Sequence, residues 1–241
     1  MIKIENLNVG FGDKLILENI NLEIPDNQVT TIVGQSGSGK SVLMKTIEGL
    51  FKPVRGKIWI DDTEITSLSK SNLNKVRHKM SMLFQESALL DSLNVFQNVA
   101  LPVYENNRES ESRILELVEK NLRLVGLEKA LSKMPSELSG GMKKRVALAR
   151  AIIRQPRYII YDEPTTGLDP IISDEITKLI LKLQNSYPLT SIIITHDMDC
   201  VSKVKGNIAM LHDKKIMFSG RYEEFINSVN PIIRKFLHKE D

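Results

Sequence analysis

Residues 34–41 read Gly-Gln-Ser-Gly-Ser-Gly-Lys-Ser and form the segment with the clearest chemistry. They lie between an apolar, β-branched segment, residues 29–33, and a segment of helical character that extends to about Leu50. Because glycine has no side chain to restrict its backbone, Gly37 and Gly39 allow consecutive N–H groups to point inward at a phosphate. The N-terminus of the following helix adds the positive end of its dipole. In this setting the segment predicts a loop that binds nucleotide phosphates.

Two side chains at the end of this loop are expected to act individually. Lys40 is placed to bridge the β- and γ-phosphates, and Ser41 to give its hydroxyl to Mg²⁺. A glycine-rich turn that binds nothing is the alternative, but the strand before the loop and the helix after it favour the phosphate site. The residues predicted to bind the nucleotide here are Gly34, Gln35, Ser36, Gly37, Ser38, Gly39, Lys40, Ser41 and Val42.

An apolar strand farther along the chain ends in two acidic residues. Residues 158–161 are Tyr-Ile-Ile-Tyr, and Asp162 and Glu163 follow. We expect Asp162 to hold Mg²⁺ through water, and Glu163, which points elsewhere, to polarise the attacking water as a general base. Two solvated acids at a strand end would be the simpler interpretation in isolation. The phosphate loop upstream favours a site that hydrolyses a nucleotide.

A second helix start suited to an anion lies at residues 138–145, Leu-Ser-Gly-Gly-Met-Lys-Lys-Arg. The helix that opens at Ser139 runs through Arg150, and its glycines leave the N-terminus free of side-chain bulk. One nucleotide already occupies the phosphate loop, so this helix start is interpreted as serving a nucleotide on another copy of the chain. Two-fold symmetry allows two chains to sandwich two nucleotides head to tail. A helix N-cap with glycines and no ligand is the alternative.

Strand and helix patterns around these motifs define the fold class. Strand patterns occur at residues 2–9, 15–24, 29–33, 56–60, 158–161, 191–195 and 207–211. Every residue of the run at 29–33 is β-branched and none is charged, which is typical of a parallel strand buried on both faces. Strands that alternate with helices predict an α/β fold with a mostly parallel sheet and helices on both faces.

The middle of the chain, residues 86–134, has a different character. Residues 110–125 place an apolar stripe on one helical face with charges opposite. That stripe consists of Ile114, Leu117, Val118, Leu122 and Val125. No strand pattern of a buried parallel sheet occurs there, so this part is predicted to be a helical insertion.

Composition excludes several classes of function. The 241 residues are 41% hydrophobic and 26% charged, which suits one globular domain with a sizeable insertion. A net charge of +3 is too small to indicate a nucleic-acid partner. No apolar run approaches the roughly 18–20 residues that span a bilayer, and the first residues resemble neither a signal nor a transit peptide. Any membrane role is therefore expected to come through a partner.

The one cysteine, Cys200, cannot form an internal disulfide. This favours a reducing compartment. We expect Cys200 to be a small buried hydrophobic residue.

Residues 138–145 resemble the signature sequence of ABC-type ATPases, and they lie just upstream of the acidic strand as in that family. The resemblance extends over nearly the whole chain. It implies a P-loop NTPase fold, RecA-like, with an N-terminal antiparallel β subdomain and an inserted helical subdomain. Residues 1–241 would form one nucleotide-binding domain. Its RecA-like core and β subdomain would be residues 1–85 and 155–241, and the signature-bearing helical subdomain residues 86–154.

The family implies further roles within the chain. Phe11 matches the aromatic residue that stacks on adenine, although a core position is the alternative. Gln85, after a strand at residues 81–84, matches the glutamine that contacts Mg²⁺ and the γ-phosphate side. His196 matches the histidine that holds the γ-phosphate, where an isolated histidine would more often be structural. The catalytic residues would be Glu163, His196 and Gln85, the metal ligands Ser41, Gln85 and Asp162, and the cofactors ATP and Mg²⁺.

Five residues are expected to contact the partner subunit or its ATP: Ser139, Gly140, Gly141, Met142 and Asp169. Met142 stands where many family members have glutamine, so one polar contact near the ribose or the partner interface is expected to be lost.

The resemblance implies that the chain is the ATP-hydrolysing subunit of an ABC transporter and works as a homodimer on integral membrane permease subunits. Residues 83–102, the methionine-ended signature and three C-terminal segments, residues 214–220, 223–226 and 231–237, are similar to the Mla-type branch linked to MCE proteins. That branch implies phospholipid transport between bacterial inner and outer membranes, a periplasmic MCE lipid-binding protein and a small cytoplasmic accessory protein. The chain would lie at the cytoplasmic face of the inner membrane, attached through the permease.

Other assignments fit the sequence less well or remain open. An ABC importer or a lipoprotein-releasing system with a different cargo is the main alternative. ATPases of DNA maintenance carry a long coiled-coil insertion, and no sustained heptads occur here. Translation-acting relatives usually carry two such domains, and this chain has room for one. Several apolar residues would pack inside the helical subdomain or form a groove for a permease helix: Phe84, Leu89, Leu90, Val95, Phe96, Val99 and Leu101.

Overall fold

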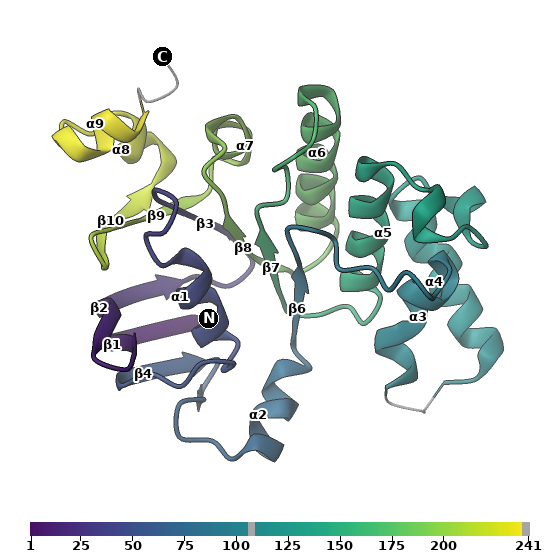
Figure 1. Ribbon diagram of the computed structural model, residues 1–241, viewed down its shortest axis with the longest axis horizontal. Helices are drawn as coiled ribbons and strands as arrows, with labels where there is room; N and C mark the ends of the chain where they lie inside the picture. The colour runs from purple at the N-terminus through teal and green to yellow at the C-terminus, as the bar shows by residue number, and fades with distance from the viewer. Residues whose placement is uncertain (106–108, 238–241) are drawn as a thin grey trace.

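Two β-sheets form the framework of the protein, whose computed structural model describes residues 1–105 and 109–237 (Figure 1). The larger sheet has the strand order β10–β9–β3–β8–β7–β6. Its strands are β3 (Val29–Val33), β6 (Met80–Leu83), β7 (Tyr158–Asp162), β8 (Thr190–Ile194), β9 (Asn207–His212) and β10 (Lys215–Arg221). All neighbours from β9 to β6 pair in parallel, and β10 pairs with β9 in antiparallel fashion. The predicted mostly parallel sheet is confirmed.

The smaller sheet lies at the N-terminal end of the chain and is antiparallel throughout. Its strand order is β2–β1–β4–β5. The strands are β1 (Ile2–Phe11), β2 (Lys14–Ile24), β4 (Arg55–Ile60) and β5 (Thr63–Glu64). The antiparallel β subdomain expected from the family resemblance is therefore present.

Helices cover both faces of the larger sheet. The α-helices in the described part of the chain are α1 (Lys40–Ile47), α2 (Lys70–Arg77), α3 (Val95–Tyr104), α4 (Glu111–Leu124), α5 (Gly140–Ile152), α6 (Pro170–Ser186), α7 (Met198–Val204), α8 (Tyr222–Ile226) and α9 (Pro231–Leu237). Side chains alternate across a strand, so successive residues of β7 enter different cores. Ile159 and Tyr161 pack in the cluster that includes α6, whereas Ile160 packs with α1 and the smaller sheet.

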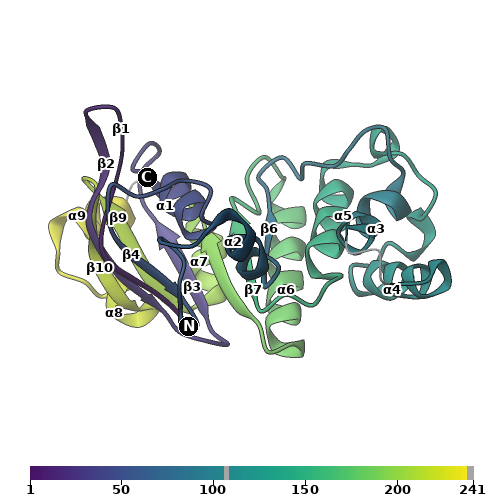
Figure 2. The ribbon, with the colours of Figure 1, turned by 90° about the horizontal axis from the view of Figure 1, so that it is seen from below.

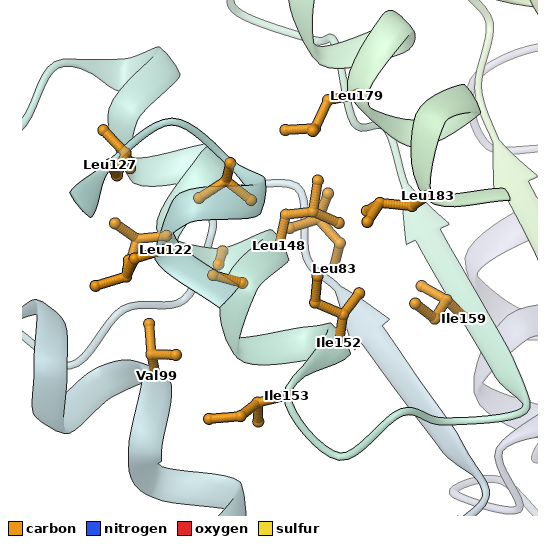
Figure 3. Close-up of a cluster of buried hydrophobic side chains, with 14 of the residues drawn as sticks. Leu83, Val99, Leu122, Leu127, Leu148, Ile152, Ile153, Ile159, Leu179 and Leu183 are labelled. Atoms are coloured by element: carbon orange, nitrogen blue, oxygen red, sulfur yellow. The ribbon is translucent and has the colours of Figure 1, made fainter. Parts of the chain in front are cut away.

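Helices α3, α4 and α5 form a lobe at one end of the molecule, and the smaller sheet lies at the other end (Figures 1 and 2). Figure 3 shows α5 side chains Leu148 and Ile152 between the lobe and the sheet, with Ile159 of β7 and Leu183 of α6 beyond them. One continuous apolar cluster therefore joins the lobe to the sheet through α5. The predicted subdomain boundaries at residues 86 and 154 fall after β6 and between α5 and β7.

Parallel register brings the ends of four strands to one edge of the larger sheet. Leu83 pairs with Tyr161, and Asp162 pairs with Ile194, which itself pairs with Ile32. The loops that follow β3, β6, β7 and β8 therefore start side by side. Ligands of open α/β sheets bind at this carboxyl edge.

Candidate nucleotide site

The phosphate loop runs from β3 into α1, as the sequence predicts. Gly37 has φ 79° and Gly39 has φ 107°, in the left-handed region that favours glycine. The side chain of Lys40 is 8% exposed, and its Nζ donates to the carbonyl oxygens of Gly34 at 2.7 Å and Gln35 at 3.1 Å. Burial lowers the pKa of Lys40, and the negative charges of Glu163 and Asp162 oppose that effect.

The loop has features that fit nucleotide phosphates. The Oγ of Ser38 is buried and has no hydrogen-bond partner within residues 1–105 and 109–237. A buried hydroxyl without a partner is unfavourable unless a ligand satisfies it. A Cβ at Gly34 would lie 2.9 Å from that oxygen, so the narrow turn leaves no space for a side chain there. Nothing lies within 4 Å of a Cβ built at Gly37, so the loop is open on its outer side.

Glu163 is held in a constrained turn directly after β7. Its φ is 47°, which is uncommon for a residue other than glycine and costs about 1–3 kcal/mol. The Oε1 atom lies 2.9 Å from Nδ1 of His196, and Oε2 accepts hydrogen bonds from the hydroxyls of Thr166 and Thr195 at 3.0 and 3.2 Å. The turn thus brings Glu163 and His196 together from two strand ends.

Asp162 ends β7 and is partly buried. Burial raises the pKa of its carboxyl, and the adjacent charge of Glu163 raises it further. Lys45, Lys144 and Lys40 act in the opposite direction. A bound divalent cation would stabilise the ionised form of such a carboxylate. Mg²⁺ is typically bound through one or two carboxylates together with phosphate oxygens, and Asp162 with the Ser41 hydroxyl fits that pattern.

Gln85 follows β6 at the same edge of the sheet, and its side chain is exposed. The backbone carbonyl oxygen of Gln85 accepts a hydrogen bond from Nζ of Lys144. The structure therefore brings the Gln85 segment next to Asp162 without a hydrogen bond between the two side chains.

Phe11 lies at the end of β1 and is 51% exposed, so it is not a core residue. Its ring contacts that of Phe51 edge-on, with centroids 5.1 Å apart and an interplanar angle of 82°. The Nζ of Lys45 lies 5.7 Å from the centre of the Phe51 ring. Sequence reasoning missed Phe51, because no spacing rule connects it to a residue 40 positions earlier.

We predict that Phe51→Ala weakens ATP binding without slowing hydrolysis. An edge-on aromatic pair contributes about 0.5–1.5 kcal/mol, which is about a two- to tenfold change in an equilibrium constant. Loss of the pair frees the Phe11 ring to rotate, so KM for ATP should rise in that range while kcat stays within twofold. Steady-state phosphate release measures both, and Phe51→Tyr should retain the normal KM. A drop in kcat alone would contradict this role.

The signature segment starts α5. Ser139 caps the helix through Oγ, which accepts from the Met142 N–H at 3.3 Å, and both Ser139 and Gly140 are exposed. Gly141 is buried, and a Cβ there would lie 2.6 Å from Cγ2 of Ile172. Met142 packs against the large apolar cluster, so its side chain contributes to packing in this structure.

The signature helix α5 lies apart from the phosphate loop of the same chain. Figures 1 and 2 show α1 on one side of strands β7 and β6, and α5 in the helical lobe on the other side. Asp169 is exposed near this lobe and caps α6 by accepting from the N–H groups of Ile171 and Ile172 at 3.1 and 3.0 Å.

The apolar residues after β6 divide between core and surface. Val95 and Val99 are buried, and Leu89 and Phe96 pack against the same cluster. The half-exposed side chains of Phe84 and Leu90 line a hollow of about 320 Å³ together with Leu101, Pro102 and Arg150, among others. Cys200 is buried as expected, and burial raises the pKa of its thiol to about 11.

Comparisons with known proteins agree with this geometry. The family model described as "ABC transporter" matches residues 17–166. The chain is 40% identical over 240 residues to the "Intermembrane phospholipid transport system ATP-binding protein MlaF" of Haemophilus influenzae. The aligned region covers 100% of this chain and 91% of that protein. It is 38% identical over 237 residues to the "Probable ribonucleotide transport ATP-binding protein mkl" of Mycobacterium leprae, and that aligned region covers 98% of this chain and 68% of that protein.

Solved structures agree with the same fold. The dimeric, post-hydrolysis structure of the ATP-binding cassette MJ0796 bound to ADP and Pi superposes with a TM-score of 0.83 at 31% identity, covering 92% of this chain and 98% of that one. The ABC transporter component cbiO1 of Clostridium perfringens gives 0.87 at 33% identity, covering 98% and 94%.

Fold and site together define a nucleotide-binding domain that binds and hydrolyses ATP. The chain belongs to the ABC transporter family. It is therefore the ATP-hydrolysing subunit that energises a transporter. Within residues 1–105 and 109–237, none of the helices has both the length and the apolar character needed to cross a bilayer.

Proposed function

We propose that this chain powers phospholipid transport between the inner and outer membranes of a bacterium. The observation that carries the proposal is the 40% identity, over the whole chain, to a protein named for intermembrane phospholipid transport. The ribonucleotide-named relative is matched over only 68% of its length, so it is the weaker guide to cargo. The proposed complex contains a homodimer of this chain, permease subunits, a periplasmic MCE lipid-binding protein and a small cytoplasmic accessory protein.

Each ATP is proposed to lie between the phosphate loop of one protomer and the Ser139 end of α5 of its partner. The exposure of Ser139, Gly140 and Asp169 supports this arrangement. The chain's own α1 and α5 lie on opposite sides of β7 and β6 in Figures 1 and 2, which supports it too. Gly141 and Met142 support the same surface from beneath, through their packing on Ile172 and the apolar cluster.

Bound ATP would supply the phosphoryl group, and Mg²⁺ would supply positive charge that offsets the charge of the phosphates. Lys40 would bind the β- and γ-phosphates, and Ser41, Gln85 and Asp162 would hold the metal ion. Glu163 accepts the proton of the attacking water. Because Nδ1 of His196 already contacts Glu163, its Nε2 is the nitrogen available to the γ-phosphate.

The hollow lined by Phe84, Leu90 and Leu101 is the proposed docking surface for a helix of the permease. Phe84 and Leu90, which line this hollow, lie on either side of Gln85 in the sequence. A shift of the Gln85 loop on hydrolysis would therefore be transmitted to the docked helix. The chain is thus proposed to be peripheral, at the cytoplasmic face of the inner membrane.

The cargo is tested by purifying the complex from membranes into lipid nanodiscs. Mass spectrometry should identify a permease and an MCE protein among the co-purified chains. With radiolabelled phospholipid on one side, the complex should move it in an ATP-dependent manner, and Phe84→Glu should release the permease while leaving the ATPase chain folded. Co-purification with a permease but no MCE protein, together with transport of a different cargo, would contradict the proposal.

A further inference from the structure

Lys144 is a buried cation in the signature helix that none of the roles above uses. Its side chain is 3% exposed. The Nζ atom donates to the carbonyl oxygen of Gln85, and it lies 3.4 Å from the carbonyl oxygens of both Phe84 and Glu163. A lysine ammonium has three N–H donors, so the three carbonyls use its full donor capacity.

Packing alone does not explain a lysine here. A buried ammonium is expensive unless it is well hydrogen-bonded, and a leucine or methionine would fill the same space without that penalty. Burial lowers the pKa of Lys144, while the charges of Asp162 and Glu163 oppose the shift. The cation is thus stabilised by the backbone of two catalytic segments and by the acidic pair itself.

A second cation from α5 holds the next part of the same loop. The guanidinium of Arg150 donates to the carbonyl oxygens of Ser87 and Ala88, each at 2.7 Å. Ser87 and Ala88 have φ values of 64° and 45°, in the left-handed region that side chains disfavour. This strained turn after Gln85 is therefore fixed to α5 through backbone carbonyls.

We propose that Lys144 is a positioning residue that sets the relative placement of Gln85, Glu163 and the signature helix. The ammonium links α5 to the loop after β6 and to the turn after β7, which no other single side chain in the described part of the chain does. When α5 moves with the helical lobe, both backbone segments move with it or lose a hydrogen bond. This deepens the proposed function, because it rests on the catalytic roles given above to Gln85 and Glu163.

The mechanical consequence is specific to the hydrolysis step. Lys144 touches neither the phosphate loop nor Phe11, so ATP binding by one protomer does not depend on it. A small displacement of catalytic groups can lower a rate about 100-fold without changing ground-state binding. Lys144 is thus expected to affect kcat much more than the affinity for ATP.

The test compares three variants in the complete transporter complex. Lys144→Met keeps most of the apolar stem of the side chain and removes every donor, and Lys144→Arg keeps the charge and the donors. Lys178→Met removes an exposed lysine from α6 as a control. We expect Lys144→Met to lower kcat about 10- to 100-fold, with the Kd for a fluorescent ATP analogue within about twofold of the parent. Lys144→Arg should recover most of the rate, and Lys178→Met should match the parent.

A non-additive double variant distinguishes positioning from general loss of stability. Lys144→Met should cause little further loss in a Glu163→Gln background, because both changes impair the same step. If Lys144→Met fails to fold, Lys144→Gln, which keeps two N–H donors, should fold and give an intermediate kcat. A normal kcat for Lys144→Met, or equal losses of ATP affinity and kcat in every variant, would overturn the proposal.

The same measurements separate this inference from the proposed function. Glu163→Gln that still turns over would refute the role of Glu163 itself. An inactive Glu163→Gln beside a fully active Lys144→Met would refute only the positioning role of Lys144. Because phosphate release is measured without reference to cargo, neither outcome depends on phospholipid transport.

Discussion

Glu163→Gln is expected to bind ATP normally and to hydrolyse it at least about 100-fold more slowly, the scale of losing a general base. Glutamine has nearly the same shape, so the turn held by His196, Thr166 and Thr195 should persist. What disappears is the carboxylate that accepts a proton from water. Steady-state and single-turnover phosphate release measure the rate, and a fluorescent ATP analogue measures binding.

The control for this change is Glu116→Gln, which alters an exposed glutamate paired with Arg113 on α4. Its turnover should equal that of the parent. Near-normal hydrolysis by Glu163→Gln would refute the general-base role.

Slow hydrolysis also tests the proposed shared site. With ATP and Mg²⁺ bound and not consumed, Glu163→Gln should accumulate as a dimer, because the Ser139 end of α5 from each protomer is proposed to close on the nucleotide of the other. Light scattering of the variant, alone and within the complex, reports the state. A variant that remains monomeric even with its membrane partners would contradict the proposed sandwich.

Local patterns predicted most of the elements at this site. The β-branched run of β3 and the acidic end of β7 come from short segments in which each residue has an evident environment. The loop between β3 and α1 was equally predictable, because its glycines and its lysine match the pattern of a phosphate-binding loop. The amphipathic helix predicted at residues 110–125 is α4, Glu111–Leu124. Sequence reasoning succeeds where a segment's own composition determines its structure.

Contacts between distant segments were not predictable in the same way. Lys143 and Lys144 are adjacent and chemically identical, yet only Lys144 is buried with three carbonyl partners. The sequence gives no sign of which lysine turns inward, because the choice depends on how α5 lies against β6 and β7. Met142 is a similar case, since its packing on the apolar cluster depends on the fold.

Helix α2 was missed for a different reason. Only Val76 among its residues is buried, so it has no apolar stripe to reveal a helical period. Its position is instead fixed by Arg77, which donates to the carbonyl oxygens of Glu48 and Gly49, both at 2.9 Å. These bonds join residues 28 and 29 positions apart.

Lys40→Met should reduce the affinity for ATP by about 100-fold, and no change at another residue of this chain is expected to cost more binding. Hydrogen bonds to charged groups contribute about 1.5–3 kcal/mol, or about 10- to 150-fold in Kd, and the ammonium serves two phosphates at once. Methionine preserves the buried stem, so the effect isolates the charge. Lys40→Ala should lose at least as much, because it also leaves a cavity.

Calorimetric titration with ATP and Mg²⁺ measures the change, and Lys52→Ala, at an exposed lysine beyond α1, is the control that should bind normally. The carbonyl oxygens of Gly34 and Gln35 lose their donor in both Lys40 variants. Thermal unfolding without nucleotide therefore shows whether the loop itself is destabilised. An unchanged Kd in a folded Lys40→Met protein would mean that the phosphates are bound elsewhere. If a triphosphate lay in this loop, the loss of the nearby ammonium would have to weaken its binding.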